Sequence, residues 1–204
     1  MRILTRYCAA VVAALFALAA PAQEPGPEEL IRKMTAEVLD SIRADKQLAA
    51  GDRQKALELA ERKILPHINF TEAARLAVGP AWQQATPEQQ AQLALEFRRM
   101  LIRVYSRAIS AYSGQTMKVL PVQVNPGDTR TTVRNHYLRP GHEPILVVYS
   151  MRKVSEGWKI YDVSFQGVSL VTAYRSEFDA ILKQGGIDGL IKRMREKNTP
   201  VPLG

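Results

Sequence analysis

Cysteine is nearly absent from this chain, which contains Cys8 alone among its 204 residues. Cys8 begins an apolar run that follows a short basic segment and leads into the small residues Ala20-Pro21-Ala22. That succession is typical of a cleavable secretory signal peptide. We therefore expect residues 1–22 to be removed, which leaves a chain with neither disulfides nor thiolate metal ligands.

Long hydrophobic runs are also missing after residue 22, where no apolar segment approaches the roughly 20 residues that a membrane-spanning helix needs. Residues 23–204 are long enough to bury a sizeable core, and 46% of the chain is apolar. We expect residues 23–204 to form one soluble domain that works outside the cytoplasm.

Common catalytic motifs are missing as well: the sequence has no G-x-S-x-G elbow, no Walker A loop and no G-x-G-x-x-G. Its three histidines are His67, His136 and His142, and none has a cysteine or a tight carboxylate cluster beside it. We expect no metal site, no cofactor and no catalysis.

Asp162 is the carboxylate that most needs an explanation, because it stands between Tyr161 and Val163 in an otherwise apolar segment. An aspartate among core residues requires a partner. We expect a structural hydrogen bond or salt bridge, with Arg175 as one candidate partner. The alternative is that Asp162 is the general base of a small enzyme.

Acidic residues are outnumbered, 20 against 28 basic ones, which gives a net charge of +8. Loss of Arg2 and Arg6 with the signal peptide would reduce the charge to +6. Such a balance favours anionic surfaces, whether of nucleic acid, acidic protein or phospholipid. Because the chain is expected to be exported, we expect no nucleic-acid partner.

Helical spacing of apolar residues dominates both ends of the chain. Thr86-Pro87-Glu88-Gln89 combines an N-cap hydroxyl, a proline at the first helical position and a capping-box glutamine, which predicts the start of the longest helix. The expected helices cover about 27–50, 52–64, 70–78, 87–112, 170–184 and 187–197.

Between these helices the apolar pattern has period two, with expected strands at about 116–124, 129–139, 144–154 and 157–165. Short turns join them, so the strands should form an antiparallel meander. Apolar residues at 145–149 point to both faces of the third strand, so we expect it to be covered on both sides. The fold class is α+β, with helices packed on a curved four-stranded antiparallel sheet that encloses a cone.

Two stretches, Ile64 to Tyr112 and Gly157 to Met194, resemble the MlaC family of periplasmic phospholipid-binding proteins, also called toluene-tolerance proteins. The motifs that carry the resemblance are Leu76 to Trp82 with Ala85-Thr86, Gly157-Trp158, Tyr161-Asp162-Val163, Gly167-Val168-Ser169-Leu170-Val171 and Tyr174-Arg175-Ser176. The sequence departs from the family pattern at Asn69 and Gln166, where an acidic residue is expected.

The resemblance implies that the cone is an apolar lipid cavity that holds phospholipid acyl chains, with the headgroup outside and the lipid bound as cargo. It implies two docking partners in the periplasm: an MCE-domain subunit of an inner-membrane ABC transporter, and an outer-membrane lipoprotein associated with a porin. The implied function is phospholipid transport that maintains outer-membrane lipid asymmetry. A related branch of the family is associated with hopanoids, which are the alternative cargo.

By position, the lipid-binding wall should come from the long helix, the third and fourth strands and the segment that follows them. The expected lining residues are Phe97, Leu101, Val104, Tyr105, Val147, Tyr149, Tyr161, Val163, Val168, Leu170, Tyr174 and Phe178. Candidates for contacts with anionic headgroups or acidic partners are Arg103, Arg107, Arg130 and Arg134, with plain solvation as the alternative for each.

Overall fold

The computed structural model describes residues 24–110, 116–139 and 141–199, and only the backbone of 104–110. The expected signal peptide, residues 1–22, lies outside these ranges. Within them, no helix combines the length and the apolar character needed to cross a membrane.

Helices form close to where the sequence predicts them, except that Asp45 has an extended backbone and divides the helix expected at about 27–50 into two. They are α1 (Pro27–Ala44), α2 (Lys46–Ala49), α3 (Arg53–Lys63), α4 (Phe70–Val78), α5 (Pro87–Ser110) and α6 (Leu170–Asn198), with 3₁₀ turns at Leu65–His67 and Gly79–Gln84. The expected capping box is confirmed: Gln89 N donates to Thr86 Oγ1 at 3.2 Å, and Thr86 N donates to Gln89 Oε1 at 3.0 Å. Gly186 has non-helical angles (φ 62°, ψ −162°) that divide α6 into the two expected helices.

The strands form one open antiparallel meander in the order β1 (Thr116–Val119), β2 (Arg130–Leu138), β3 (Ile145–Val154), β4 (Gly157–Phe165) and β5 (Val168–Ser169). The expected α+β class is confirmed, with a fifth strand of two residues added to the expected four. A turn at Gln166 and Gly167 joins β4 to β5, and both of its residues have positive φ, 49° and 83°. That conformation suits glycine and places β5 beside the end of β4.

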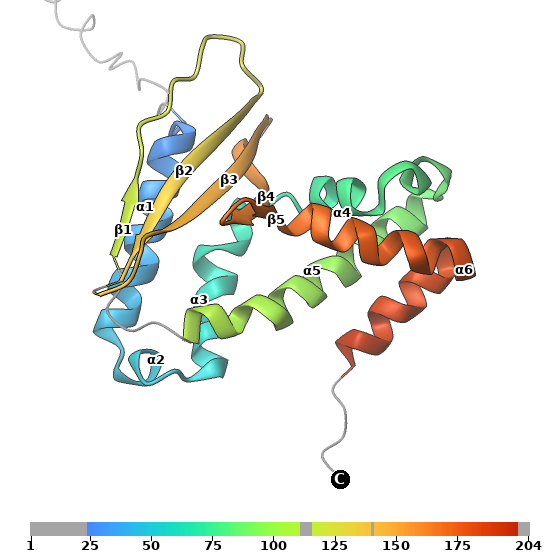
Figure 1. Cartoon of the computed structure of the whole chain (residues 1–204), viewed down its shortest axis with the longest axis horizontal. Helices are drawn as coiled ribbons and strands as arrows, with labels where there is room; N and C mark the ends of the chain where they lie inside the picture. Colours follow the sequence, from blue (N-terminus) through green and yellow to red (C-terminus); the bar gives the residue numbers. More distant parts are fainter. Residues whose placement is uncertain (1–23, 111–115, 140, 200–204) are drawn as a thin grey trace, which may run out of the picture.

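The chain divides into a sheet part and a helical part (Figure 1). In the sheet part, Ile31 and Met34 of α1 pack with Val133, Met151 and Ile160 of the strands. In the helical part, α4, α5 and α6 enclose a second core that includes Leu93, Phe97, Phe178, Leu190 and Met194. Each part therefore has its own buried cluster, and the space between them has to be defined by other contacts.

The two faces of the sheet are buried to different extents. Val147, Tyr149 and Met151 of β3 are buried on the inner face, which α1 covers, whereas Leu146 and Val148 on the outer face are only half-buried. In Figure 1, β1 and β2 cross in front of α1, so that the view is onto this outer face. The expectation that β3 is covered on both sides is therefore wrong, because apolar side chains on both faces of a strand do not show that a second layer covers the outer face.

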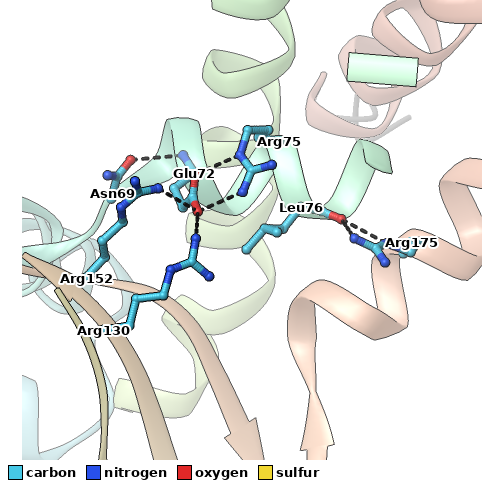
Figure 2. A network of polar contacts seen from close by, with 7 residues as sticks. All are labelled: Asn69, Glu72, Arg75, Leu76, Arg130, Arg152 and Arg175. Atoms are coloured by element: carbon cyan, nitrogen blue, oxygen red, sulfur yellow. Dashed lines mark hydrogen bonds and ion pairs between the residues drawn. The ribbon is translucent and has the colours of Figure 1, made fainter. Parts of the chain in front are cut away.

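A buried carboxylate joins the helical part to the sheet (Figure 2). Glu72 of α4, which is 6% exposed, accepts hydrogen bonds from Arg75 Nε and Nη2, both at 2.8 Å. Its Oε1 also pairs with Arg152 at 3.2 Å and with Arg130 at 3.4 Å. Asn69 Oδ1 accepts from Glu72 N at 2.9 Å and so caps α4. An amide oxygen caps a helix as a carboxylate does, so the departure from the family pattern at this position does not remove the cap.

The other end of α4 is held by α6. Arg175 Nε donates to the carbonyl oxygen of Leu76 at 2.9 Å, and Arg175 Nη2 donates to the same oxygen. This carbonyl belongs to the last turn of α4, where no intrahelical partner is available. Gly79 ends the helix with φ 69°, a conformation that disfavours side chains.

Because the Arg75 hydrogen bonds and the charges of Arg75, Arg152 and Arg130 hold the pKa of Glu72 below its ordinary value, Glu72→Gln tests this connection. We expect the substitution to lower the free energy of unfolding by roughly 1–3 kcal/mol at neutral pH, since three guanidiniums lose their shared anion. A carboxylate whose pKa is lower in the folded state than in the unfolded state stabilises the fold. This stabilisation is complete at pH values above the unfolded-state pKa and is lost as the pH falls through the folded-state pKa.

The free-energy difference between wild type and Glu72→Gln in urea unfolding should therefore be constant near neutrality and shrink below about pH 4.3. Glu58→Gln, a substitution at an exposed helix position, is the matched control and should change little. A Glu72→Gln difference that persisted undiminished in acid would contradict an electrostatic origin.

Candidate functional site

An apolar cavity of about 510 Å³ lies between the inner face of the sheet and the helices. Its volume falls within the range of about 300–1,000 Å³ that is usual for small-molecule sites. The helical wall combines α1, the end of α3 with the turn that follows it, the start of α4, and α5. Its members are Met34, Thr35, Val38, Leu39, Ile42, Ala60, Ile64, Leu65, Ile68, Phe70, Ala73, Phe97, Leu101 and Ile102.

The opposite wall comes from β1, β2, β3 and β4 and from the start of α6. Its members are Met117, Tyr137, Arg139, Ile145, Val147, Tyr149, Ile160, Tyr161, Asp162, Val163, Phe165, Leu170 and Val171. Among the residues that the structure describes, the charged groups on the two walls are Arg139 and Asp162, so this part of the wall is suited to hydrocarbon.

A β-bulge shapes this wall at its centre. Ser150 pairs with Asp162 and Met151 pairs with Ile160, so Tyr161 is an extra residue without a partner in β3. A bulge twists the strand and redirects its side chains, which allows the consecutive residues Ile160, Tyr161 and Asp162 all to reach the cavity. The Arg130 guanidinium lies 5.8 Å from the centre of the Tyr161 ring.

Asp162 is fully engaged in a structural role. Its Oδ2 accepts from Ser169 Oγ at 2.6 Å and its Oδ1 accepts from Val171 N at 3.1 Å. Ser169 Oγ in turn accepts from Thr172 N at 3.0 Å and caps α6. The expected structural hydrogen bond is confirmed, but Arg175 as its partner is wrong, because Arg175 is directed to α4.

Two buried hydroxyls on the wall belong to Tyr149 and Thr35. Burial raises the pKa of Tyr149 to about 12, and the Asn135 side chain beside it offsets part of that rise. Thr35 Oγ1 is buried and has no hydrogen-bond partner among the described residues. Within those same ranges, no group of three or more His, Cys, Asp or Glu side chains could hold a metal ion. The wall is thus suited to an apolar ligand.

The structure places seven of the twelve expected lining residues on the cavity wall: Phe97, Leu101, Val147, Tyr149, Tyr161, Val163 and Leu170. Val168 lies elsewhere, since it is 61% exposed in β5. Tyr174 and Phe178 pack within the helical core, where their ring centres lie 5.3 and 5.6 Å from that of Phe97. The side chains of Val104 and Tyr105 are outside the described residues. Lipid contact by any of the twelve stays a prediction.

Sequence reasoning missed the contribution of α1 and α3 to the wall. The apolar stripe of α1 is visible in the sequence, but it does not indicate whether the stripe faces a filled core or an open space. Ile31 packs against the sheet, Met34 packs against the sheet and also lines the cavity, and Val38 and Leu39, further along the helix, line the cavity. What separates these positions is the distance between each turn of α1 and the sheet, and the sequence of α1 does not contain that distance.

Comparisons with known proteins agree with this geometry. The chain is 23% identical over 176 residues to the "Intermembrane phospholipid transport system binding protein MlaC" of Haemophilus influenzae, a match that covers 85% of this chain and 82% of that protein. It is also 23% identical over 192 residues to the "Toluene tolerance protein ttg2D" of Pseudomonas putida, with 91% and 86% covered.

A solved structure, the phospholipid-binding protein of Ralstonia solanacearum in complex with a phospholipid, superposes with a TM-score of 0.77 at 33% identity. The match covers 85% of this chain and 97% of that one. The family model described as MlaC protein matches residues 32–196, which include every described residue of the cavity wall, from Met34 to Val171. This chain therefore belongs to the MlaC family.

Proposed function

We propose that this chain is a periplasmic carrier that holds a phospholipid by its acyl chains and moves it between the inner and outer membranes. The observation that carries the proposal is the apolar cavity of about 510 Å³ between the sheet and the helices. Further support comes from the Ralstonia solanacearum relative, which has the same fold and was solved with a phospholipid.

The energetics of hydrocarbon explain why such a carrier is needed. Shielding a methylene from water contributes about 0.8 kcal/mol, so two acyl chains with roughly 30 methylenes have a gross driving force of about 24 kcal/mol. Spontaneous release into water is therefore negligible. A docked partner that offers a continuous apolar path removes this barrier, because the chains then pass from one apolar environment to another.

The partners that suit this role are the MCE-domain subunit of an inner-membrane ABC transporter and an outer-membrane lipoprotein with its porin. The carrier supplies a cavity and a docking surface, while direction comes from the partners' relative affinities or from ATP hydrolysis by the transporter. With this cargo, the process maintains the lipid asymmetry of the outer membrane. The name of the Haemophilus influenzae relative, which places it in an intermembrane phospholipid transport system, supports the assignment.

The direct test is to identify the cargo. We expect the exported, purified protein to keep its lipid in native mass spectrometry, and solvent extraction should yield phospholipid. Extraction of a hopanoid instead would assign the chain to the alternative cargo. Protein that is empty after gentle purification and that takes up no phospholipid from vesicles would contradict the carrier proposal.

Leu101→Trp tests the cavity wall directly. Leu101 of α5 lines the cavity, so an indole there should occupy the volume of an acyl chain and weaken lipid retention by roughly ten-fold or more. Leu95→Trp is the matched control, because Leu95 lies on the same helix and is 42% exposed. Equal lipid content in the two variants, measured by native mass spectrometry, would show that this part of the wall does not hold the cargo.

Substitutions at Asp162 distinguish a carrier from an enzyme. We expect Asp162→Ala to lower the free energy of unfolding by about 1–2 kcal/mol, because Ser169 Oγ and Val171 N lose their acceptor, with the cargo unchanged. Asp162→Asn keeps an acceptor oxygen and should cost less. An Asp162→Asn protein of full stability that accumulated an altered lipid would instead favour the enzyme.

A further inference from the structure

The outer face of the sheet gathers basic side chains. Strand registers place Lys118 of β1, Arg130, Arg134 and His136 of β2, and Arg152 of β3 on this face, because side chains alternate along each strand. We call these five residues the basic face. The inner-face positions between them, including Val119, Val133 and Asn135, are buried.

Basic side chains on the basic face stand directly opposite one another. Lys118 pairs with His136 across β1 and β2, and Arg130 pairs with Arg152 across β2 and β3. The like charges of Arg130 and Arg152, in opposed positions, repel each other. Lys118 and Arg134 form no ion pair with any residue that the structure describes. Lys118 and Arg134 therefore contribute no ion pair to the stability of the described part of the chain.

Glu72 orients part of the basic face without neutralising it. Its Oε1 is shared by Arg130 and Arg152 while Arg75 also binds the carboxylate, so three guanidiniums surround one negative charge (Figure 2). The side chains of Arg130 and Arg152 remain 52% and 41% exposed. Each has further N–H donors, so the pair presents fixed donors to an external anion.

We propose that the basic face is a contact site for the anionic phospholipid headgroups of a membrane surface. Phosphate oxygens accept the hydrogen bonds that the guanidiniums offer, and a plane of headgroups can meet all five side chains at once. The half-buried Leu146 and Val148 lie among the cations and can contact the interfacial region.

This surface also adjoins the cavity. Arg130 lies over the ring of Tyr161, which lines the cavity, and Arg139, just beyond the end of β2, lines it as well. The basic face and the cavity wall therefore approach each other at Tyr161, while the rest of the sheet lies between them. The contact goes beyond the carrier function proposed above, and its failure would leave that function intact.

The test measures co-sedimentation of the full chain with vesicles of phosphatidylcholine, with and without phosphatidylglycerol. We expect binding to the anionic vesicles alone, and binding that weakens as salt is added. Each Lys or Arg near such a surface contributes about five-fold in affinity, so Lys118→Glu combined with Arg134→Glu should weaken binding by at least about 25-fold.

The matched control is Arg53→Glu combined with Lys192→Glu, which changes the net charge equally at exposed positions on α3 and α6. This control should bind as wild type does, apart from the small effect of net charge. Native mass spectrometry of bound lipid checks the carrier function separately. If the glutamate pair does not fold, Lys118→Gln with Arg134→Gln replaces it and should weaken binding by about 25-fold.

Three results would overturn the proposal. In the first, wild type shows no preference for anionic vesicles, because it binds neutral and anionic vesicles equally or binds neither. In the second, the face variant and the control lose the same affinity, which would indicate a net-charge effect. In the third, wild type ignores anionic vesicles while the face variant loses binding to a protein partner such as the MCE-domain subunit, which would assign the basic face to that partner.

Discussion

The position of Glu72 between the sheet and the helical part is the constraint on which the rest of the structure depends. The two parts have separate buried clusters, and the cavity lies where they meet. Core packing cannot fix the width of an open space, because a cavity lacks the contacts that hold its walls apart. Directional bonds from a single carboxylate to three arginines, together with the Arg175 contact at the other end of α4, set that geometry instead.

Phe97 marks the boundary between packed core and open cavity. Its ring contacts Tyr174 and Phe178 in edge-to-face arrangements on the helical side, and its side chain also lines the cavity. Along the same helix, Leu93 is fully buried in the core and Leu101 faces the cavity. One amphipathic stripe thus contributes both to the core and to the cavity wall, and the change occurs between Leu93 and Leu101, a little more than two turns apart.

The elements of this fold were predictable from sequence because caps, turns and apolar periodicity are local. The helix starting at Thr86, the break at Gly186 and the meander all follow from neighbouring residues. The cavity was less predictable. Tyr174 and Phe178 have the same helical spacing of apolar residues as the residues that line the cavity, yet they pack in the helical core. Val168 continues the alternation expected of a strand, but its two-residue strand leaves the side chain exposed to solvent. Whether an apolar side chain meets another element, a cavity or solvent depends on the spacing of distant segments.

The hydrocarbon lining also has a consequence for folding. An apolar cavity that water does not fill is in effect a core with part of its interior missing, because the side chains around it lack contact atoms on one side. An acyl chain that enters completes the core in the way an additional large side chain would. Occupancy and conformational stability are then thermodynamically linked: whatever binds only the folded chain raises its resistance to unfolding, and an unloaded molecule is the less stable form.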